Sequence, residues 1–150
     1  MKNLFDAARA AEIDRRIASV EPGSPARWGR MDAAQAMAHC AAGVAMATGD
    51  IRPPRALAGR IFGALVKRLA FRDDAPMRPN SPTVTELRVA DERDMATEKA
   101  RLRARLAEFA AGGAARCTTH PHPFFGKLTP DEWAVLMYKH LDHHLRQFGA

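Results

Sequence analysis

The stretch TPDEWAVLMYKHLDHHLRQF, residues 129–148, decides the fold. It opens with a helix start signal, because Thr129 is a suitable N-cap, Pro130 fits the first helical position and Glu132 completes a capping box. Apolar side chains then recur every three or four residues and form one continuous stripe. Its members are Trp133, Leu136, Met137, Leu141, Leu145 and Phe148. The pattern predicts a long helix packed against a core.

Two histidines, His140 and His144, lie within this apolar stripe. At 3.6 residues per turn they are about 40° apart on the helix face and roughly 6 Å apart along the axis, which suits the chelation of a metal ion. A buried pair without a metal would need separate hydrogen-bond acceptors, which favours metal binding over two ordinary core histidines. His143 falls toward the polar edge near Gln147, where we expect hydrogen bonds or solvent. Gln147 or Asp142 is a candidate partner for a ligand's second ring nitrogen, and His143, like Gln147, is expected to support the ligands without binding the metal.

The rest of the chain is also rich in Ala, Leu, Arg, Met and Glu, which favours helix. We expect helices at about residues 4–20, 32–48, 55–70 and 91–111, because Pro and Gly clusters separate these segments. Only residues 82–89 could pass for a strand. The proline-rich residues 71–82 predict a long irregular loop, either a linker or a lid over a pocket. The fold class is therefore all-α, and 150 residues fit a single domain, 1–150.

A third imidazole, His39, lies in the expected helix 32–48. Ala, Met, Val and Cys occupy most of the circumference of this helix, which is typical of a buried helix. His39 is thus expected in the interior or at a cavity, where it could face His140 and His144 across a bundle core. Three His ligands and an open position describe a catalytic metal site. Cys40 points about 100° away from His39 and is a weak ligand candidate.

Two further residues are weak candidates for proton transfer. Glu98 lies at the edge of an apolar helix face, where a solvated flank residue is the better interpretation and a general base the alternative. His122 lies in the stiff segment THPHPFFG, residues 119–126, with His120. A rigid turn over the bundle end is the first interpretation of this segment, and His122 as a pocket wall or proton carrier is the second.

Composition and charge narrow the class of protein. The formal charge is +6, but Lys and Arg are interspersed with Asp and Glu, and no basic run carries stacking aromatics, so we expect no nucleic-acid partner. No apolar run reaches the roughly 20 residues of a spanning helix, and the first residues lack the apolar core of a secretory signal. Cys40 and Cys117 form no CxxC pair. We expect a cytoplasmic protein with no membrane partner.

The pattern MAHCA at residues 37–41, followed about a hundred residues later by HLDHHLRQFG at 140–149, resembles the DinB-like superfamily of metal-dependent enzymes. The segments RWGRMDAAQAMAH and HPFFGKLTPDEWAVLMYKH extend the similarity over most of the chain, and the second is similar to a subgroup whose activity is not established. The resemblance implies an up-down-down-up four-helix bundle with an extra short helix. It also implies His39, His140 and His144 as metal ligands, with Gln147 matching a Gln of the family.

The resemblance further implies a Zn or Ni ion and, by analogy, a homodimer. Characterised relatives include transferases and isomerases that use a low-molecular-weight thiol. The expected function is thus a metal-dependent enzyme that activates a thiol or water for a small-molecule substrate, with hydrolysis as a variant. The alternative is a non-enzymatic, metal-stabilised or metal-sensing bundle, linked to a stress response.

Overall fold

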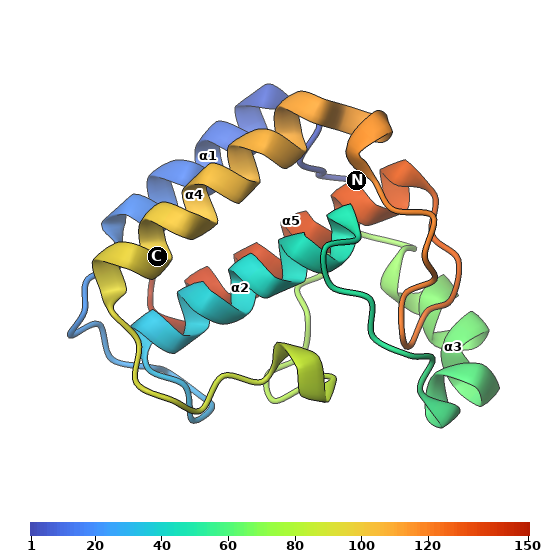
Figure 1. Cartoon of the computed structure of the whole chain (residues 1–150), viewed down its shortest axis with the longest axis horizontal. Coiled ribbons are helices and arrows are strands. Elements are labelled where there is room, and N and C mark those ends of the chain that lie inside the picture. Colours follow the sequence, from blue (N-terminus) through green and yellow to red (C-terminus); the bar gives the residue numbers. More distant parts are fainter.

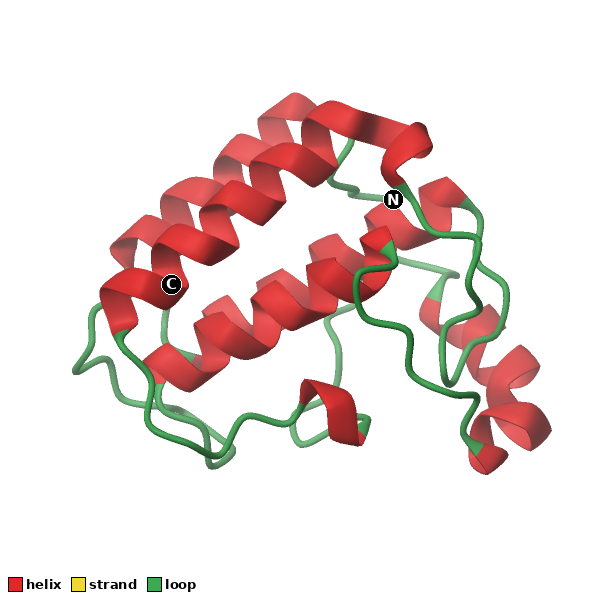
Figure 2. Ribbon diagram, viewed as in Figure 1, coloured by secondary structure: helices red, strands yellow, loops and turns green.

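The computed structural model describes residues 1–150 and contains five α-helices and no strand (Figure 2), so the all-α prediction is confirmed. The helices are α1 (Ala7–Ser19), α2 (Ala33–Thr48), α3 (Leu57–Ala70), α4 (Met95–Gly112) and α5 (Pro130–Gln147). Residues 82–89 form no strand but contain the short 3-10 helix η1 (Thr85–Leu87), and a second one, η2 (Gly113–Arg116), follows α4. No helix combines the length and the apolar character needed to cross a membrane.

Four of the helices form a bundle around one core. In Figure 1, α1 lies beside α4 and α2 lies beside α5, and contacts between α2 and α4 and between α1 and α5 join the two pairs. Helices α1 and α5 run in one direction and α2 and α4 in the other, which is the predicted up-down-down-up arrangement. The core is a single continuous cluster, with Trp133 and Phe109 as its largest fully buried side chains.

Caps fix where the bundle helices begin. Both α2 and α5 start with a complete capping box, Asp32 with Gln35 and Thr129 with Glu132. Helix α4 begins at Met95, about four residues later than its sequence pattern suggests, because the Asp94 side chain accepts a hydrogen bond from the backbone N–H of Thr97. An N-cap side chain satisfies a free backbone N–H group in the first turn, and this fixes the residue at which the helix begins.

Helix α3 lies outside the bundle, at the lower right of Figure 1. Its only buried residues are Gly59 and Gly63, whose lack of side chains lets the helix approach the backbone of Phe124. At its C-terminal end, the Lys139 ammonium group on α5 donates hydrogen bonds to the carbonyl oxygens of Ala70 (2.7 Å) and Asp73 (2.6 Å). The predicted extra helix is therefore present and attached to the bundle at both ends.

Candidate metal centre

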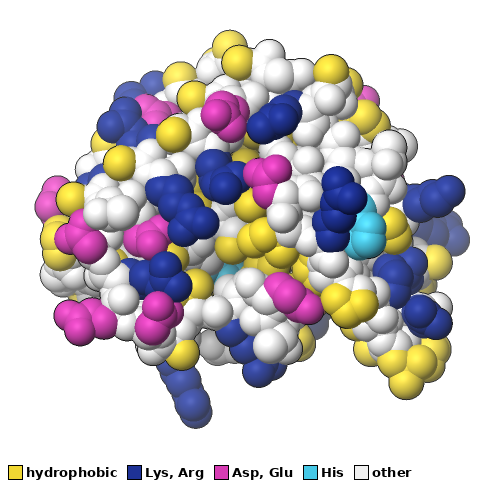
Figure 3. Space-filling model, in the orientation of Figure 1, with side chains coloured by type: hydrophobic (Ala, Val, Ile, Leu, Met, Phe, Trp, Pro, Cys, Tyr) yellow, Lys and Arg dark blue, Asp and Glu magenta, His cyan; other side chains and the backbone are white.

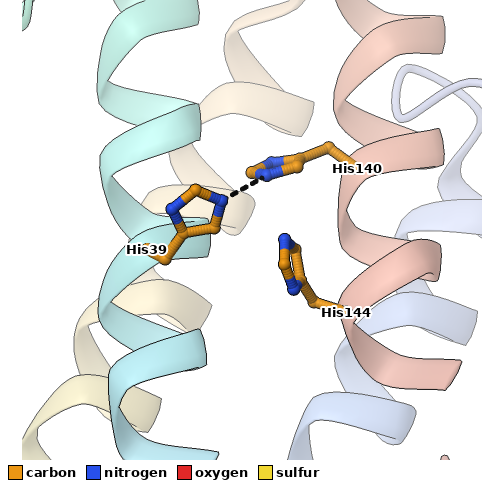
Figure 4. A group of neighbouring side chains, drawn as sticks. All are labelled: His39, His140 and His144. Atoms are coloured by element: carbon orange, nitrogen blue, oxygen red, sulfur yellow. Dashed lines mark hydrogen bonds between the residues drawn. The ribbon is translucent and has the colours of Figure 1, made fainter. Parts of the chain in front are cut away.

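Three imidazoles from two helices meet between α2 and α5 (Figure 4). His39 comes from α2, and His140 and His144 come from successive turns of α5, so all three point into the space between the two helices. One ring nitrogen of each lies within 4.8 Å of the others. His39 and His144 are only 4% and 7% exposed, whereas His140 is partly exposed.

His39 is oriented by the backbone of η1. Its Nδ1 lies 2.7 Å from the carbonyl oxygen of Leu87. A carbonyl only accepts hydrogen bonds, so Nδ1 carries the proton and donates it. In the neutral ring the lone pair is then on Nε2, the nitrogen that faces the other two imidazoles.

His144 is oriented through a chain of two hydrogen bonds. The Nε2 amide group of Gln147 donates to the carbonyl oxygen of Trp28 at 2.6 Å, and this contact fixes which way the amide points. Oε1 of Gln147 therefore faces Nδ1 of His144, at 2.8 Å, and accepts its proton. The lone pair of His144 is left on Nε2, as in His39.

The ring of His140 packs against Gly43 of α2, in space that any larger residue at position 43 would fill. A Cβ atom at Gly43 of α2 would lie 2.7 Å from Cε1 and 2.8 Å from Nδ1 of the His140 ring, closer than real Cβ contacts. Nε2 of His140 lies 2.9 Å from Nε2 of His39. Its Nδ1 is buried and has no hydrogen-bond partner. The third imidazole is thus held by packing against Gly43 and not by an acceptor.

Burial keeps the cluster neutral. Desolvation lowers the pKa of His144 to about 3, with the neighbouring His39 as a further cause. It also lowers the pKa of His39, although the hydrogen bond to Leu87 opposes the shift, and it lowers the pKa of His140, where the charges of the other histidines add to the effect. At neutral pH all three rings are therefore uncharged, which is the form that binds metal ions.

The residues of this cluster fit a metal ion. Two nitrogens on one zinc ion lie about 3.3 Å apart because each Zn–N bond is about 2.0–2.1 Å long, and the 2.9 Å between His39 and His140 is close to this value. Hydrogen bonds from the opposite ring nitrogen to a carbonyl or amide oxygen, as in His39 and His144, are typical of metal-binding histidines. The only titratable groups in the cluster are imidazoles, so nothing negative offsets the charge of a divalent ion.

His143 is buried, not solvated, and lies beside the cluster. Its ring stands edge-on to that of His144, with centroids 4.9 Å apart, and packs at 5.4 Å from the ring of Trp28. Its Nδ1 is 3.3 Å from the carbonyl oxygen of Met77, in the proline-rich segment. We expected His143 either to form hydrogen bonds or to face solvent, and the structure shows the hydrogen bond. Its partner is the Met77 carbonyl and not one of the three clustered histidines.

Glu98 is not a solvated flank residue, so that interpretation was wrong. It is 5% exposed on α4, between the guanidinium groups of Arg93 (3.1 Å) and Arg101 (3.4 Å). These two ion pairs compensate for the burial of its charge. Its hydrogen bonds go to these arginines and not to an imidazole, so it stands apart from the three gathered histidines.

His122 forms the turn that precedes α5. Its Nδ1 accepts hydrogen bonds from the backbone N–H groups of Phe124 and Phe125, and its backbone pairs with Gly126. Burial lowers its pKa to about 4, and the charge of Arg55 adds to the shift. Nδ1 of His122 is therefore engaged in holding the turn, in line with the first interpretation of this segment. His120 bonds to the carbonyl oxygen of Pro53, at 3.1 Å.

Three other residues considered in the sequence lie away from the cluster's chemistry. Asp142 was expected as a hydrogen-bond partner of an imidazole but forms ion pairs with Arg16 (2.8 Å) and Arg146 (2.7 Å). Cys40 is buried, which raises the pKa of its thiol, and Cys117 is half-buried with a pKa raised to about 11. Both thiols are therefore protonated at neutral pH, and neither is among the groups that converge on the centre.

The sequence interpretation missed three parts of the centre. The carbonyl groups of Leu87 and Trp28 have no residue-type signal, because any residue offers a backbone oxygen. Gly43 did carry one, since it lies one helical turn after His39 in a helix that is otherwise rich in Ala and Met. A glycine inside such a helix costs stability relative to alanine and indicates a close approach by another group.

Comparison with known proteins gives one match. Residues 5–150 match the family described as "Protein of unknown function (DUF1569)". No curated protein and no solved structure matches the chain. The match spans all five helices and all three clustered histidines. The chain therefore belongs to the DUF1569 family, whose structure is DinB-like.

Proposed function

We propose that His39, His140 and His144 hold one divalent transition-metal ion, zinc or nickel, and that the protein is a metal-dependent enzyme that activates a thiol or water. The observation that carries the proposal is the convergence of three neutral imidazoles within 4.8 Å. Imidazole suits several ions of this kind, so the ligands do not choose between zinc and nickel.

The charge of the cluster supports an anionic fourth ligand. Three neutral nitrogens leave the charge of a divalent ion uncompensated, and a thiolate or hydroxide would balance it. When bound, the ion would supply Lewis acidity that lowers the pKa of a thiol or water and makes it nucleophilic at neutral pH. Because His140 is partly exposed while His39 and His144 are buried, a substrate would approach from the His140 side.

The residues of the chain have separate roles in this proposal. Leu87 and Gln147 hold His39 and His144 with their Nε2 lone pairs toward the centre. The proline-rich segment bonds to α5 at Lys139 and His143, the two residues that adjoin His140 and His144 in sequence. This attachment supports its role as a lid that limits the access of water.

A second candidate function is a metal-stabilised or metal-sensing bundle without catalysis. The observation in its favour is that the cluster joins α2 to α5 across 101 residues of chain, at a point where two of the three imidazoles are buried. An ion at this point would stabilise the folded state over the unfolded one. The two functions differ in whether an exogenous ligand can reach the ion.

The first experiment is elemental analysis of untagged protein purified without chelators. We expect close to one zinc or nickel ion per chain in the parent protein and almost none in folded His144→Ala. The matched control is His143→Gln, which removes the neighbouring imidazole on the same helix and should keep the ion. Absence of metal in the parent, with no uptake on titration, would refute the metal centre.

The second experiment separates the two functions. The ion is replaced by Co²⁺, whose visible spectrum depends on its ligands, and glutathione or another small thiol is titrated in. A new sulfur-to-cobalt charge-transfer band that His144→Ala lacks would support thiol activation. A spectrum unchanged by thiols, with no shift on raising the pH, would indicate a closed site and favour the metal-stabilised bundle.

A further inference from the structure

Nearly all the large apolar side chains that the molecule exposes are on one helix. Apart from Met1, they all belong to α3, and they are 52 to 74% exposed: Leu57, Ile61, Phe62, Leu65 and Leu69. Figure 3 shows hydrophobic side chains gathered at the lower right, at the corner where α3 lies in Figure 1. An exposed apolar patch of this extent, several hundred Å² of surface, marks an interaction site in a folded protein.

Four of these side chains form a ridge with a symmetrical spacing. Leu57, Ile61, Leu65 and Leu69 follow one another at intervals of four residues, equally distributed on both sides of Gly63. Ridges of this i, i+4 type pack into the corresponding grooves of a second helix at about −50°. In an antiparallel pair centred near Gly63, Ile61 would meet Leu65 of the second helix and Leu57 would meet Leu69.

The charges on α3 are compatible with this pairing. The helix contains three basic residues, Arg60, Lys67 and Arg68, and no acidic one. Lys67 is already paired with Glu132 at 2.8 Å. In the antiparallel register, Arg60 would lie opposite Val66 and Arg68 opposite Ala58, so no arginine faces another arginine across the ridge. The small side chain of Ala58 leaves room for the stem of Arg68.

The helix is also held so that the ridge faces outward. Gly59 and Gly63 seat the opposite face on Phe124, and Lys139 holds the C-terminal end. A standard protein–protein interface buries about 800 Å² on each partner, and weaker ones about 600 Å². A patch of several hundred Å² is of the order of the weaker class, and a second copy of the same chain offers an equal patch to cover it.

We infer that the α3 ridge is the interface of a two-fold symmetric homodimer, in which the α3 helices of two copies pack antiparallel with Ile61 against Leu65 of the partner chain. A two-fold interface uses the same patch on both chains, and a ridge symmetric about its own centre satisfies that condition. The inference depends on α3 alone and is independent of the metal centre.

The first test is the molar mass of the protein by sedimentation velocity and light scattering at micromolar concentration. We expect twice the 16.5 kDa of one chain. Ile61→Asp/Leu65→Asp should be monomeric. The matched control is Ala100→Asp/Ala104→Asp, which adds two charges at the same spacing on exposed positions of α4 and should remain dimeric. A monomeric parent, or a dimer that survives the α3 variant, would overturn the inference.

The second test addresses the register and does not depend on the loss of a dimer. Ile61→Glu and Leu65→Lys are expected to be largely monomeric alone and to form a heterodimer when mixed, because positions 61 and 65 meet across the axis. Ile61→Glu mixed with Leu69→Lys should stay monomeric, since position 69 meets position 57. Equal recovery in both mixtures would refute the register.

A third measurement examines the competing occupant, a lipid surface. Co-sedimentation of the parent with phosphatidylglycerol vesicles and with phosphatidylcholine vesicles should recover little protein in either pellet. A monomeric parent that binds the anionic vesicles, and loses that binding in Ile61→Asp/Leu65→Asp, would replace the homodimer by a membrane-surface helix.

Discussion

Helices α5 and α3 are both amphipathic, yet their apolar faces have opposite surroundings. Helix α5 starts with a capping box and buries Trp133, Leu141 and Leu145 in the core. Helix α3 has no side-chain cap and buries only two glycines. Periodicity therefore identifies an apolar face but not what covers it. Core contacts hold α5 in place, whereas α3 is held by backbone contacts at Phe124 and by the hydrogen bonds of Lys139.

The largest expected difference in the free energy of unfolding is between truncating one leucine on α5 and truncating one on α3. Leu141→Ala removes a fully buried side chain and should lower the free energy of unfolding by about 2 to 5 kcal/mol. Leu65→Ala removes a side chain that is mostly exposed in one chain, and the change should stay within about 0.5 kcal/mol. Urea unfolding with chelator, at a concentration where the chain is monomeric, measures both. Similar losses for the two variants would contradict the contrast between the helices.

The next effect compares two glycines that allow close approach. Gly43→Ala would push the ring of His140 aside, and the cost of overpacking, about 1 to 3 kcal/mol, predicts a metal affinity reduced roughly tenfold to a hundredfold. Gly63→Ala would meet the carbonyl oxygen of Phe124, which cannot rotate away, so α3 should detach while metal affinity stays within about twofold. Competition with a chromophoric chelator measures the affinity, and hydrogen exchange of α3 amides measures the detachment.

The third effect concerns the turn around His122, which precedes α5 and contacts α3 through Phe124. His122 has a pKa of about 4 in the folded protein and about 6.5 when unfolded. Between these values the unfolded chain binds the extra proton, so stability falls as the pH falls from 6.5 to 4, by up to about 1.4 kcal/mol per pH unit. In His122→Asn the Oδ1 oxygen can accept the same backbone N–H groups without titrating.

The measurement is thermal or urea unfolding of both proteins between pH 4 and pH 7. The other buried histidines contribute to the slope in parent and variant alike, so the expected difference is close to one proton. Identical slopes would show that His122 does not titrate in this way.

The smallest effect tests the missing cap of α3. Ala56→Asp places a side-chain acceptor at the N-cap position and should stabilise α3 by about 1 kcal/mol, seen as slower hydrogen exchange of its first-turn amides. Ala64→Asp adds the same charge in the middle of α3, at an exposed position, and should give no such gain. No change in α5 amides is expected for either variant, because each helix starts independently.

The sequence was informative wherever local chemistry determines the structure. The capping box of α5, the five helices and the burial of His39 follow from residue type and spacing, and these predictions are confirmed. The three imidazoles could be expected on facing helices because each lies in an apolar pattern. That they bind a metal stays a prediction.

The remaining features depend on contacts between distant segments. The ion partners of Glu98 lie within five residues of it, but its burial depends on how α4 packs against the rest of the bundle, which spacing along α4 alone does not predict. The orientation of His39 depends on the Leu87 carbonyl, 48 residues away, and that of His144 on the Trp28 carbonyl through Gln147. The exposure of α3 is likewise a tertiary property, since the same helix would look identical in sequence if a partner covered it.

The separation of 101 positions between His39 and His140 also matters during synthesis. At 5 to 20 residues per second, α2 leaves the ribosome roughly 5 to 20 seconds before α5 is complete. Helix α2 is apolar around most of its circumference and lacks its partner α5 during that time. The next long helix to be synthesised that packs on it is α4. Folding therefore passes through a stage in which His140 and His144 have not yet been synthesised, while the apolar surface of α2 is still incompletely covered.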